Sequence, residues 1–537
     1  MQDSSERRGL IGIVSVFAVA GLTRLWILAQ GVPLFHDQVL YVRMAELLDA
    51  GRWRYPVGLD TPCLYELPTA GLSACYPPLF PVLMSGLSMG PVAPAMAGLA
   101  ISFVAGLCTL LLLNSLLKAV LRPTWRLVAL SGVALSPLSH FIGTTAFTES
   151  LYICLVTAAM AALVVPKSRP LGTGAAAGGA LGLAYLARPE AVTLVPIFLV
   201  LIAFRWLDWS WMRRALQGAA LLVGFAVVVG PPIAHLQANG HVRAWHQEKA
   251  AFGAVLDERL VRMPLEEAYF ALNEDGSRFQ VSAPTETAAA SAQMASAPVA
   301  FAVRRVVNAW DKAGQLLPAG GPITLVMSLI ALGVPLATRR RRALLVSTFL
   351  IALLGYTLAL NIVSQARLLA MSVPPLFALV GWCMQLIAST STAQRPWARR
   401  PGQVLVGLVV LALLVVSTVG ATVLVKVRAG TFFTSGPVAD WLRDNTDPSA
   451  ALATHEPAIP YYAGRRHLTL PAAATSQQLC AYLETAGADL LVLTPREVEA
   501  HRLPPLGTVP CLSPVVVPAA LAEGVEVYGV VGAPHAG

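Results

Sequence analysis

The sequence predicts an all-α polytopic membrane protein, with a small α/β domain after its last membrane-spanning helix. The 537 residues are 56% hydrophobic and only 12% charged, whereas a soluble domain has about 25% charged residues. Apolar runs long enough to span a bilayer recur along the chain. Basic residues cluster in alternate gaps between these runs, so the net charge of +9 indicates short cytoplasmic loops rather than nucleic-acid binding.

We expect about eleven membrane-spanning helices, because one span needs about 20 apolar residues. The apolar runs lie near 10–29, 91–117, 127–146, 150–166, 171–187, 190–204, 215–235, 318–338, 343–361, 368–390 and 403–427. The first run follows Arg7 and Arg8 and has no small-residue cleavage site after it. We therefore interpret it as a retained helix and not as a signal peptide.

The basic residues also predict the orientation. One set of alternate gaps holds most of them: Arg7/Arg8, Lys118/Arg122/Arg126, Lys167/Arg169, Arg205/Arg213/Arg214, Arg339 to Arg342, and Arg395/Arg399/Arg400. The short loops of the other set hold only Arg188 and Arg367. The positive-inside rule then places the N-terminus in the cytoplasm and the C-terminal tail outside.

We expect a transmembrane module over 1–427, with long outside loops at 31–90 and 236–316, and an extracytoplasmic α/β domain over 428–537. In the first loop, apolar residues recur at helical spacing from Asp37 to Leu48, which indicates an amphipathic helix at the membrane surface. A second helix is expected between Tyr76 and Met89, started by prolines. For the second loop we expect helix and mobile loop from Leu265 to Ser296.

The tail alternates between helical and β-type patterns, as a small α/β domain does. The helical stretches are Val438–Asn445 and Ser476–Thr485, and the β-type runs are Ala451–Thr454, Leu490–Leu493 and Val525–Val531. An oxidising compartment would allow two disulfides among the cysteines of the outside segments, most simply 63–75 and 480–511.

Ionisable residues gather at the outer ends of the predicted spans, where they are costly unless they face a polar cavity. They are Asp37, Glu149, Arg188, Glu190 and Arg367. Guanidinium groups there could bind a phosphate through paired N–H donors, and a carboxylate could deprotonate a hydroxyl. Asp37 could equally cap its helix, Glu190 could be a helix cap, and His36 could be a surface residue or share a metal ion or a phosphate with Asp37.

An ordered series of motifs resembles the GT-C glycosyltransferase superfamily. It resembles especially the bacterial members akin to dolichyl-phosphate-mannose protein mannosyltransferases and lipid A aminoarabinose transferases. The series comprises Phe35 to Tyr41, Tyr76 to Pro81, Thr148 to Leu151, Ala187 to Glu190, Arg367 followed by Pro374-Pro375, and in the tail Ala439 to Arg443 and Ala488 to Val492.

This resemblance implies a hexosyl- or pentosyltransferase of the bacterial cytoplasmic (inner) membrane that uses a polyprenyl-phosphate sugar donor. It implies Asp37 as the catalytic base, and Arg188 and Arg367 as groups that bind the donor phosphate. The supporting residues would be His36, Tyr41, Tyr76, Glu149 and Glu190. Relatives have two adjacent acids where this chain has Asp37-Gln38, so a divalent metal ion, held by Asp37 and His36, is left open. The acceptor would be a lipid, a glycan or a protein.

Three other classes of protein stay open at this stage. A transporter or flippase of a lipid-linked glycan would place its polar residues near the bilayer midplane, whereas here they lie at the outer ends of the spans. An O-antigen ligase or polymerase would also join lipid-linked sugars outside the membrane, but would not need an acid directly after the first span. A scaffold or sensor would use the tail to bind a partner.

Overall fold

A computed structural model describes most of the chain outside the central third. The described residues are 2–31, 34, 37–50, 77–118, 120–164, 169–203, 210–238, 272, 276, 371, 373–391, 415, 419, 422–423, 436–473, 475–493, 497–498, 503–518 and 525–531. The contacts between residues divide the chain into two compact units. The helical unit comprises Met1–Val32, Val82–Ile233 and Val299–Lys426, and the α/β unit comprises Pro33–Pro81, Ala234–Pro298 and Val427–Gly537.

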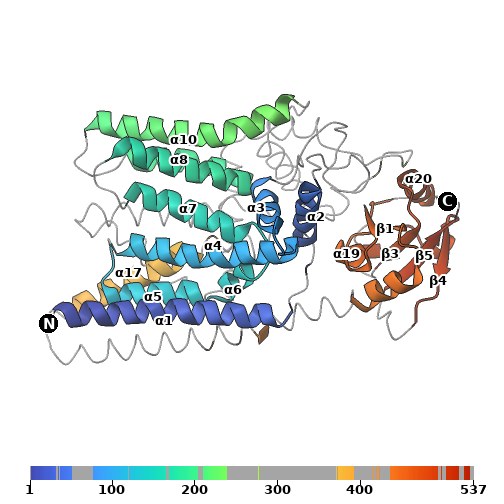
Figure 1. The fold of residues 1–537 in the computed structure, drawn as a ribbon, viewed down its shortest axis with the longest axis horizontal. Helices are drawn as coiled ribbons and strands as arrows, with labels where there is room; N and C mark the ends of the chain where they lie inside the picture. Colours follow the sequence, from blue (N-terminus) through green and yellow to red (C-terminus); the bar gives the residue numbers. More distant parts are fainter. Residues whose placement is uncertain are drawn as a thin grey trace. The chain divides into compact units, whose positions relative to one another are not determined.

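The helical unit is a bundle in which α1, α4, α7, α8 and α10 run side by side (Figure 1). Its described helices are α1 (Gln2–Ala29), α4 (Pro94–Leu117), α5 (Pro123–Leu135), α6 (Pro137–Gly143), α7 (Glu149–Val164), α8 (Pro170–Ala187), α9 (Leu194–Ala203), α10 (Trp211–Ala238) and α17 (Val373–Ser391), with the 3-10 helix η1 (Pro189–Thr193) before α9. Four of them, α4, α5, α6 and α8, begin with proline, whose fixed φ and missing N–H suit the first helical position.

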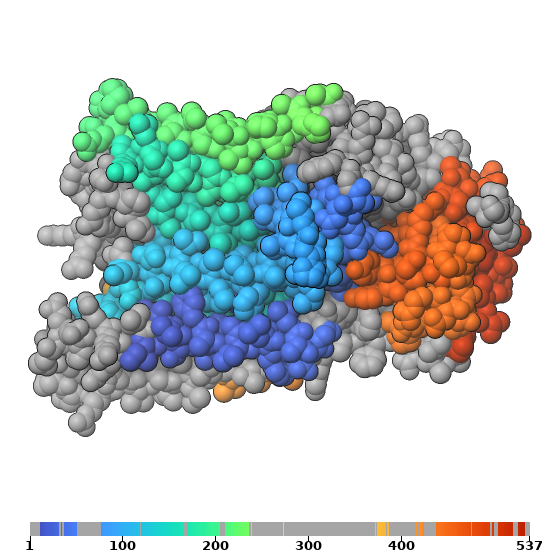
Figure 2. Space-filling view, viewed as in Figure 1, coloured from blue at the N-terminus to red at the C-terminus, as the bar shows by residue number. Residues whose placement is uncertain are grey.

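Three described helices are long and apolar enough to cross a membrane, namely Ile11–Ala29, Pro94–Leu117 and Trp211–His235. Large apolar side chains on α1 and α10 are exposed, among them Leu22 and Val227, and both helices lie at the surface in Figure 2 (dark blue and green). An apolar surface of this kind fits contact with lipid. The expected count of about eleven spans stays a prediction, because the runs at 318–338 and 343–361 lie outside the described residues.

The apolar run expected at 127–146 forms two helices with a bend between them. Helices α5 and α6 meet at an angle of 57°, and Ser136 between them is extended (φ −60°, ψ 131°). Pro137 causes the break, since a proline lacks the N–H that would continue the helix and pushes the residue before it out of the helical region. Together α5 and α6 still count as one candidate span.

Close approach of two backbones joins α8 to α10. A Cβ atom added at Gly178 would lie 2.0 Å from the carbonyl oxygen of Leu221, and one added at Gly174 would lie 2.3 Å from that of Gln217. Small residues one turn apart on α8 therefore let α10 pack directly on its backbone, a device common between helices in membranes.

The α/β unit is built on a five-stranded mixed sheet in the order β2-β1-β3-β5-β4. Its strands are β1 (Ala451–Thr454), β2 (Arg466–Thr469), β3 (Leu490–Leu493), β4 (Leu512–Val515) and β5 (Glu526–Val530). Strand β1 is parallel to β2 and β3, whereas β5 is antiparallel to β3 and β4. The unit also holds helices α2 (Asp37–Asp49), α19 (Ala458–Ala463) and α20 (Ser476–Ala486), the 3-10 helix η4 (Leu506–Thr508) and a helix at 436–445; α3 (Leu79–Ser88) begins in it and ends in the helical unit.

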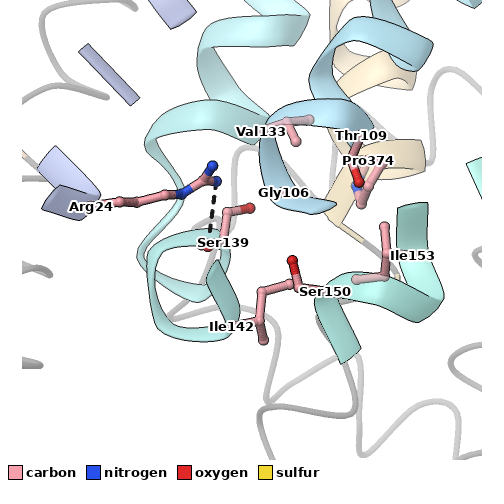
Figure 3. Close-up of a pocket in the computed structure, with 9 residues that line it drawn as sticks. All are labelled: Arg24, Gly106, Thr109, Val133, Ser139, Ile142, Ser150, Ile153 and Pro374. Atoms are coloured by element: carbon pink, nitrogen blue, oxygen red, sulfur yellow. Dashed lines mark hydrogen bonds between the residues drawn. The ribbon is translucent and has the colours of Figure 1, made fainter. Parts of the chain in front are cut away.

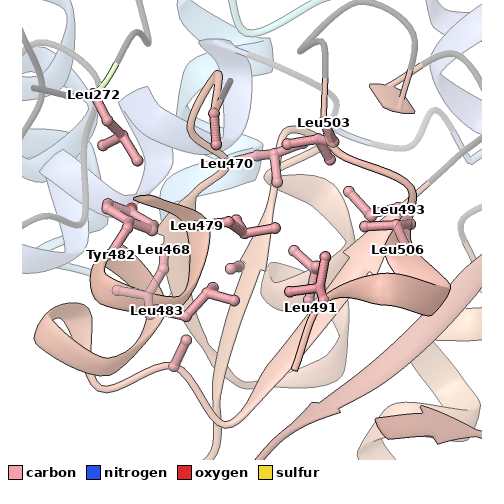
Figure 4. Close-up of a cluster of buried hydrophobic side chains, with 14 of the residues drawn as sticks. Leu272, Leu468, Leu470, Leu479, Tyr482, Leu483, Leu491, Leu493, Leu503 and Leu506 are labelled. Carbon is pink, nitrogen blue, oxygen red and sulfur yellow. The ribbon is translucent and has the colours of Figure 1, made fainter. Parts of the chain in front are cut away.

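Apolar clusters cover the sheet. One packs α20 against β1, β2 and β3 and includes Leu468, Leu483 and Leu491 (Figure 4). Another packs the helix at 436–445 and α19 against the sheet. Helix α20 begins with a capping box between Thr475 and Gln478. Each β-strand is only four or five residues long, so these helices supply much of the buried area that stabilises the sheet.

The tail matches its predicted pattern closely. The runs at Ala451–Thr454 and Leu490–Leu493 are β1 and β3, and the stretch at Ser476–Thr485 is α20 with one residue more. Cys480 on α20 and Cys511 before β4 form the expected disulfide. The other expected pair, 63–75, and the stretch 265–296, apart from Leu272 and Gly276, lie outside the described residues.

Candidate functional site

A buried ion-pair cluster lies where α7 begins and α8 ends. Arg188 directly follows α8 in an extended conformation (φ −151°, ψ 120°) because Pro189 stops the helix and starts η1. Its Nη1 lies 2.9 Å from Oε1 of Glu149, the first residue of α7, and its Nη2 donates to Oε1 of Glu190 at 3.2 Å. The tight turn thus places three predicted site residues in direct contact.

This cluster is largely withdrawn from solvent. The side chains of Arg188 and Glu149 are 13% and 6% exposed, whereas that of Glu190 is 35% exposed. The Arg188 guanidinium also lies 5.9 Å from the ring centre of Tyr152, within the range of a cation–π contact. The sequence reasoning missed Tyr152, although its position three residues after Glu149 on α7 places both side chains on one face of that helix.

Hydroxyl groups fix the start of α7 against α4. Ser102 on α4 donates its Oγ–H to the carbonyl of Phe147 at 3.2 Å, and Ser150 donates to the carbonyl of Ser102 at 2.7 Å. All three residues are buried. These two hydrogen bonds fix the start of α7 against α4. They therefore also restrict the position of Glu149, which pairs with Arg188.

Asp37 is the first residue of α2, in the α/β unit. A carboxylate in the first helical turn is favoured by the exposed N–H groups and by the helix dipole, so the capping role that the sequence allowed is compatible with its position. Asp37 has interactions of its own in the structure and its side chain is partly buried.

The α/β domain of the tail holds α2 on both sides of Asp37. Before it, the backbone N–H of Leu34 donates to the hydroxyl of Tyr462 at 2.7 Å. After it, the guanidinium of Arg43 lies 5.3 Å from the ring centre of Tyr461 and donates to the carbonyl of Arg465 at 3.5 Å. Burial raises the pKa of Tyr462, and the Leu34 N–H partly opposes that shift, so the hydroxyl stays protonated at neutral pH.

The remaining predicted residues divide into two groups. Tyr41 is buried and packs edge-on against Phe80, with ring centres 5.5 Å apart, as a core residue does. His36, Tyr76 and Arg367 lie outside the described residues. Within the part of the chain that the structure describes, no cluster of three or more His, Cys, Asp or Glu side chains could hold a metal ion.

Solved structures of membrane enzymes share this fold. The crystal structure of ArnT from Cupriavidus metallidurans bound to undecaprenyl phosphate matches with a TM-score of 0.57 at 15% identity, over 97% of this chain and 98% of that chain. The archaeal oligosaccharyltransferase AglB from Archaeoglobus fulgidus, in complex with an inhibitory peptide and a dolichol-phosphate, matches with a TM-score of 0.57 at 12% identity, over 97% and 74% of the two chains. No protein-family model and no curated protein matches the sequence.

The described part of the chain is thus a helical protein with three helices apolar enough to cross a membrane and an ion-pair cluster where α7 begins and α8 ends. Within the limits of that comparison, the chain shares the fold of ArnT and AglB, which agrees with the resemblance seen in the sequence. Identities of 12–15% establish a common fold and no more.

Proposed function

We propose that this protein is a membrane glycosyltransferase. It moves a sugar from a polyprenyl-phosphate donor to an acceptor hydroxyl on the non-cytoplasmic face of the bacterial inner membrane. The observation that carries the proposal is the fold match over 97% of the chain to ArnT bound to undecaprenyl phosphate. The buried charges at the helix ends support it, because a lipid-borne phosphate and a water-borne acceptor have to meet where hydrocarbon ends.

In the proposed reaction, the Asp37 carboxylate takes the proton of the acceptor hydroxyl, and the oxygen attacks the anomeric carbon of the donor sugar. The bond from that carbon to the phosphate oxygen breaks, and the polyprenyl phosphate leaves with the electron pair. One displacement inverts the anomeric centre. The position of Asp37 as the first residue of α2 supports this role, since the helix gives the carboxylate a defined place.

Arg188 is the proposed partner of the donor phosphate, together with Arg367. The contacts of Arg188 to Glu149 and Glu190 support this role, because they hold the guanidinium plane in one orientation before the donor arrives. Preorganised donors of this kind stabilise charge that develops on a leaving phosphate. A divalent metal ion would share that task if it binds, and removal with a chelator tests its contribution.

The tail is proposed to position the catalytic helix. Tyr462 and Arg43 tie α2 to the α/β domain on both sides of Asp37, so the domain sets where the carboxylate lies. Tyr462→Phe should lower kcat with little change in KM for the donor. The substitution removes the hydrogen bond that helps to position Asp37, and it leaves the proposed donor-binding residues unchanged. Tyr461→Phe keeps the aromatic ring over which Arg43 lies and is the matched control.

The experiment that tests the proposed function uses purified protein in proteoliposomes with radiolabelled undecaprenyl-phosphate sugars. A glycosyltransferase releases undecaprenyl phosphate and places the label in a new, water-soluble or acceptor-bound product. A transporter or flippase moves the intact donor across the bilayer without breaking the bond. Movement of label without bond cleavage would overturn the proposal. If the label is transferred, mass spectrometry of the lipid that co-purifies with the protein identifies the donor sugar.

A further inference from the structure

A buried arginine that has no part in the proposed reaction lies in the helical unit. Arg24 stands near the end of α1 and is only 2% exposed, which makes it one of the largest fully buried side chains described. Its Nη2 donates to the carbonyl of Ser139 at 3.5 Å, a long hydrogen bond. Its Nε and Nη1 are buried and have no hydrogen-bond partner among the residues that the structure describes. A guanidinium normally satisfies these donors when it is buried.

The sequence makes room for this guanidinium. A Cβ atom added at Gly143, the last residue of α6, would lie 2.9 Å from Nε of Arg24, and one added at Gly106 on α4 would lie 3.0 Å from its Nη1. Next to these glycines is a cavity of about 20 Å³, which Arg24 lines together with Ser139 and Ser150. Figure 3 shows the side chain reaching from α1 towards Ser139, with Gly106 and Ser150 on neighbouring helices. We call Gly106 and Gly143, which leave room for the Arg24 guanidinium, the glycine cradle.

Among the described residues, no acidic side chain lines the cavity beside Arg24. The sequence from Val82 to Ile233 has only three acidic residues, Glu149, Glu190 and Asp208. Glu149 and Glu190 pair with Arg188, Asp208 lies outside the described residues, and Arg24 forms no ion pair within the described part of the chain. A buried charge without a partner costs several kcal/mol, so a partner from solution is favoured.

The geometry around Arg24 points to a binding site for a single small anion of the halide type. A cavity of about 20 Å³ has room for one particle the size of a water molecule, since a water needs about 10–15 Å³ on this measure. A phosphate or a lipid head group is too large. The first turn of the sixteen-residue helix α7, which contributes Ser150, adds the partial positive charge of a helix N-terminus. The anion would thus bind next to Glu149 and stabilise the start of α7.

Bromide is the probe, because it replaces chloride and scatters anomalously. Thermal unfolding of the detergent-solubilised protein is followed while sodium bromide replaces sodium gluconate at constant ionic strength. Binding to the folded state alone makes the midpoint rise with the logarithm of bromide concentration, once the concentration exceeds Kd. We expect a rise of a few degrees per tenfold increase for the wild type. We expect none for Arg24→Met, which keeps the length of the side chain without its charge.

Arg122→Met is the matched control, because Arg122 is an exposed arginine at the start of α5. This variant should keep the full response to bromide. An anomalous peak within the Arg24 cavity in crystals of the wild type soaked in bromide supports the proposal even if Arg24→Met fails to fold. Absence of that peak, or an identical bromide response in wild type and Arg24→Met, overturns it and leaves a water molecule as the occupant. Neither result bears on sugar transfer, so failure here is separate from failure of the proposed function.

Discussion

Two arginines of the helical unit lie near the start of α7, and they differ in their partners. Arg188 contacts two carboxylates, at 2.9 and 3.2 Å, whereas the one hydrogen bond of Arg24 within the described residues goes to the Ser139 carbonyl, at 3.5 Å. Both belong to the same helical unit. The comparison teaches that burial of an arginine does not define its role. The first is fixed in place by the protein's own charges, and the second depends on a charge from outside.

The largest expected change in the free energy of unfolding follows from removing Arg188, the cation of the ion-pair cluster with Glu149 and Glu190. Arg188→Met leaves the carboxylates of Glu149 and Glu190 without the guanidinium that pairs with both. The free energy of unfolding should fall by about 3 kcal/mol, as it does when one partner of a buried ion pair is removed. Denaturation in detergent, against Arg122→Met as the surface control, measures the loss. A variant as stable as wild type would show that the ion pair adds nothing to folding.

Arg24→Met should act in the opposite direction. In buffer without halide, the variant loses an uncompensated buried charge and gains apolar contact. We expect its free energy of unfolding to rise by about 1–2 kcal/mol, as when buried charges are replaced by apolar groups of similar volume. The same denaturation experiment measures the change. If Arg24→Met is destabilised as strongly as Arg188→Met, the two arginines are alike and the comparison fails.

The glycine cradle gives a smaller effect. Gly143→Ala brings a Cβ to 2.9 Å from Nε of Arg24 and should cost about 1 kcal/mol, because the guanidinium has to shift. The double variant with Arg24→Met should recover that loss. Gly179→Ala, on α8 with nothing within 4 Å of the new Cβ, should instead gain about 0.5–1 kcal/mol in helix propensity. Equal losses at both glycines would refute the cradle.

The smallest expected change in the free energy of unfolding is at Glu190, the most exposed member of the ion-pair cluster. Glu190 is 35% exposed, so water already screens its attraction to Arg188. Glu190→Gln should change the free energy of unfolding by at most about 1 kcal/mol. A loss as large as that of Arg188→Met would mean that Glu190, and not Glu149, is the main partner of the guanidinium.

The elements that could be predicted from the sequence are those in which apolar residues recur along the whole element. Helix α2 and strands β1 and β3 start and end within a residue of their predicted bounds, because each buries one or both faces. Strands β2 and β4 escaped prediction. They are the two edges of the sheet, are only partly buried, and carry Arg466 and Pro514 where an apolar run would be expected.

The candidate site was predictable in part for a similar reason. The predicted topology places Glu149 and Arg188 at the outer ends of consecutive spans and so at one depth, and the structure pairs them. Arg24 gave no such signal, since it lies within an apolar run and its glycine neighbours come from α4 and α6, far along the chain. Contacts of that kind depend on how helices pack, which no local pattern encodes.

The most direct test of the account is sugar transfer by Asp37→Asn compared with Asp49→Asn, at the two ends of α2. Each variant is incubated with a labelled undecaprenyl-phosphate sugar and a membrane extract that supplies acceptors. The account predicts that Asp37→Asn lowers turnover by a factor of about 100 to 10,000, the usual contribution of a general base, while donor binding and folding persist. Asp49→Asn should transfer sugar as wild type does. Wild-type turnover by Asp37→Asn would contradict the central claim.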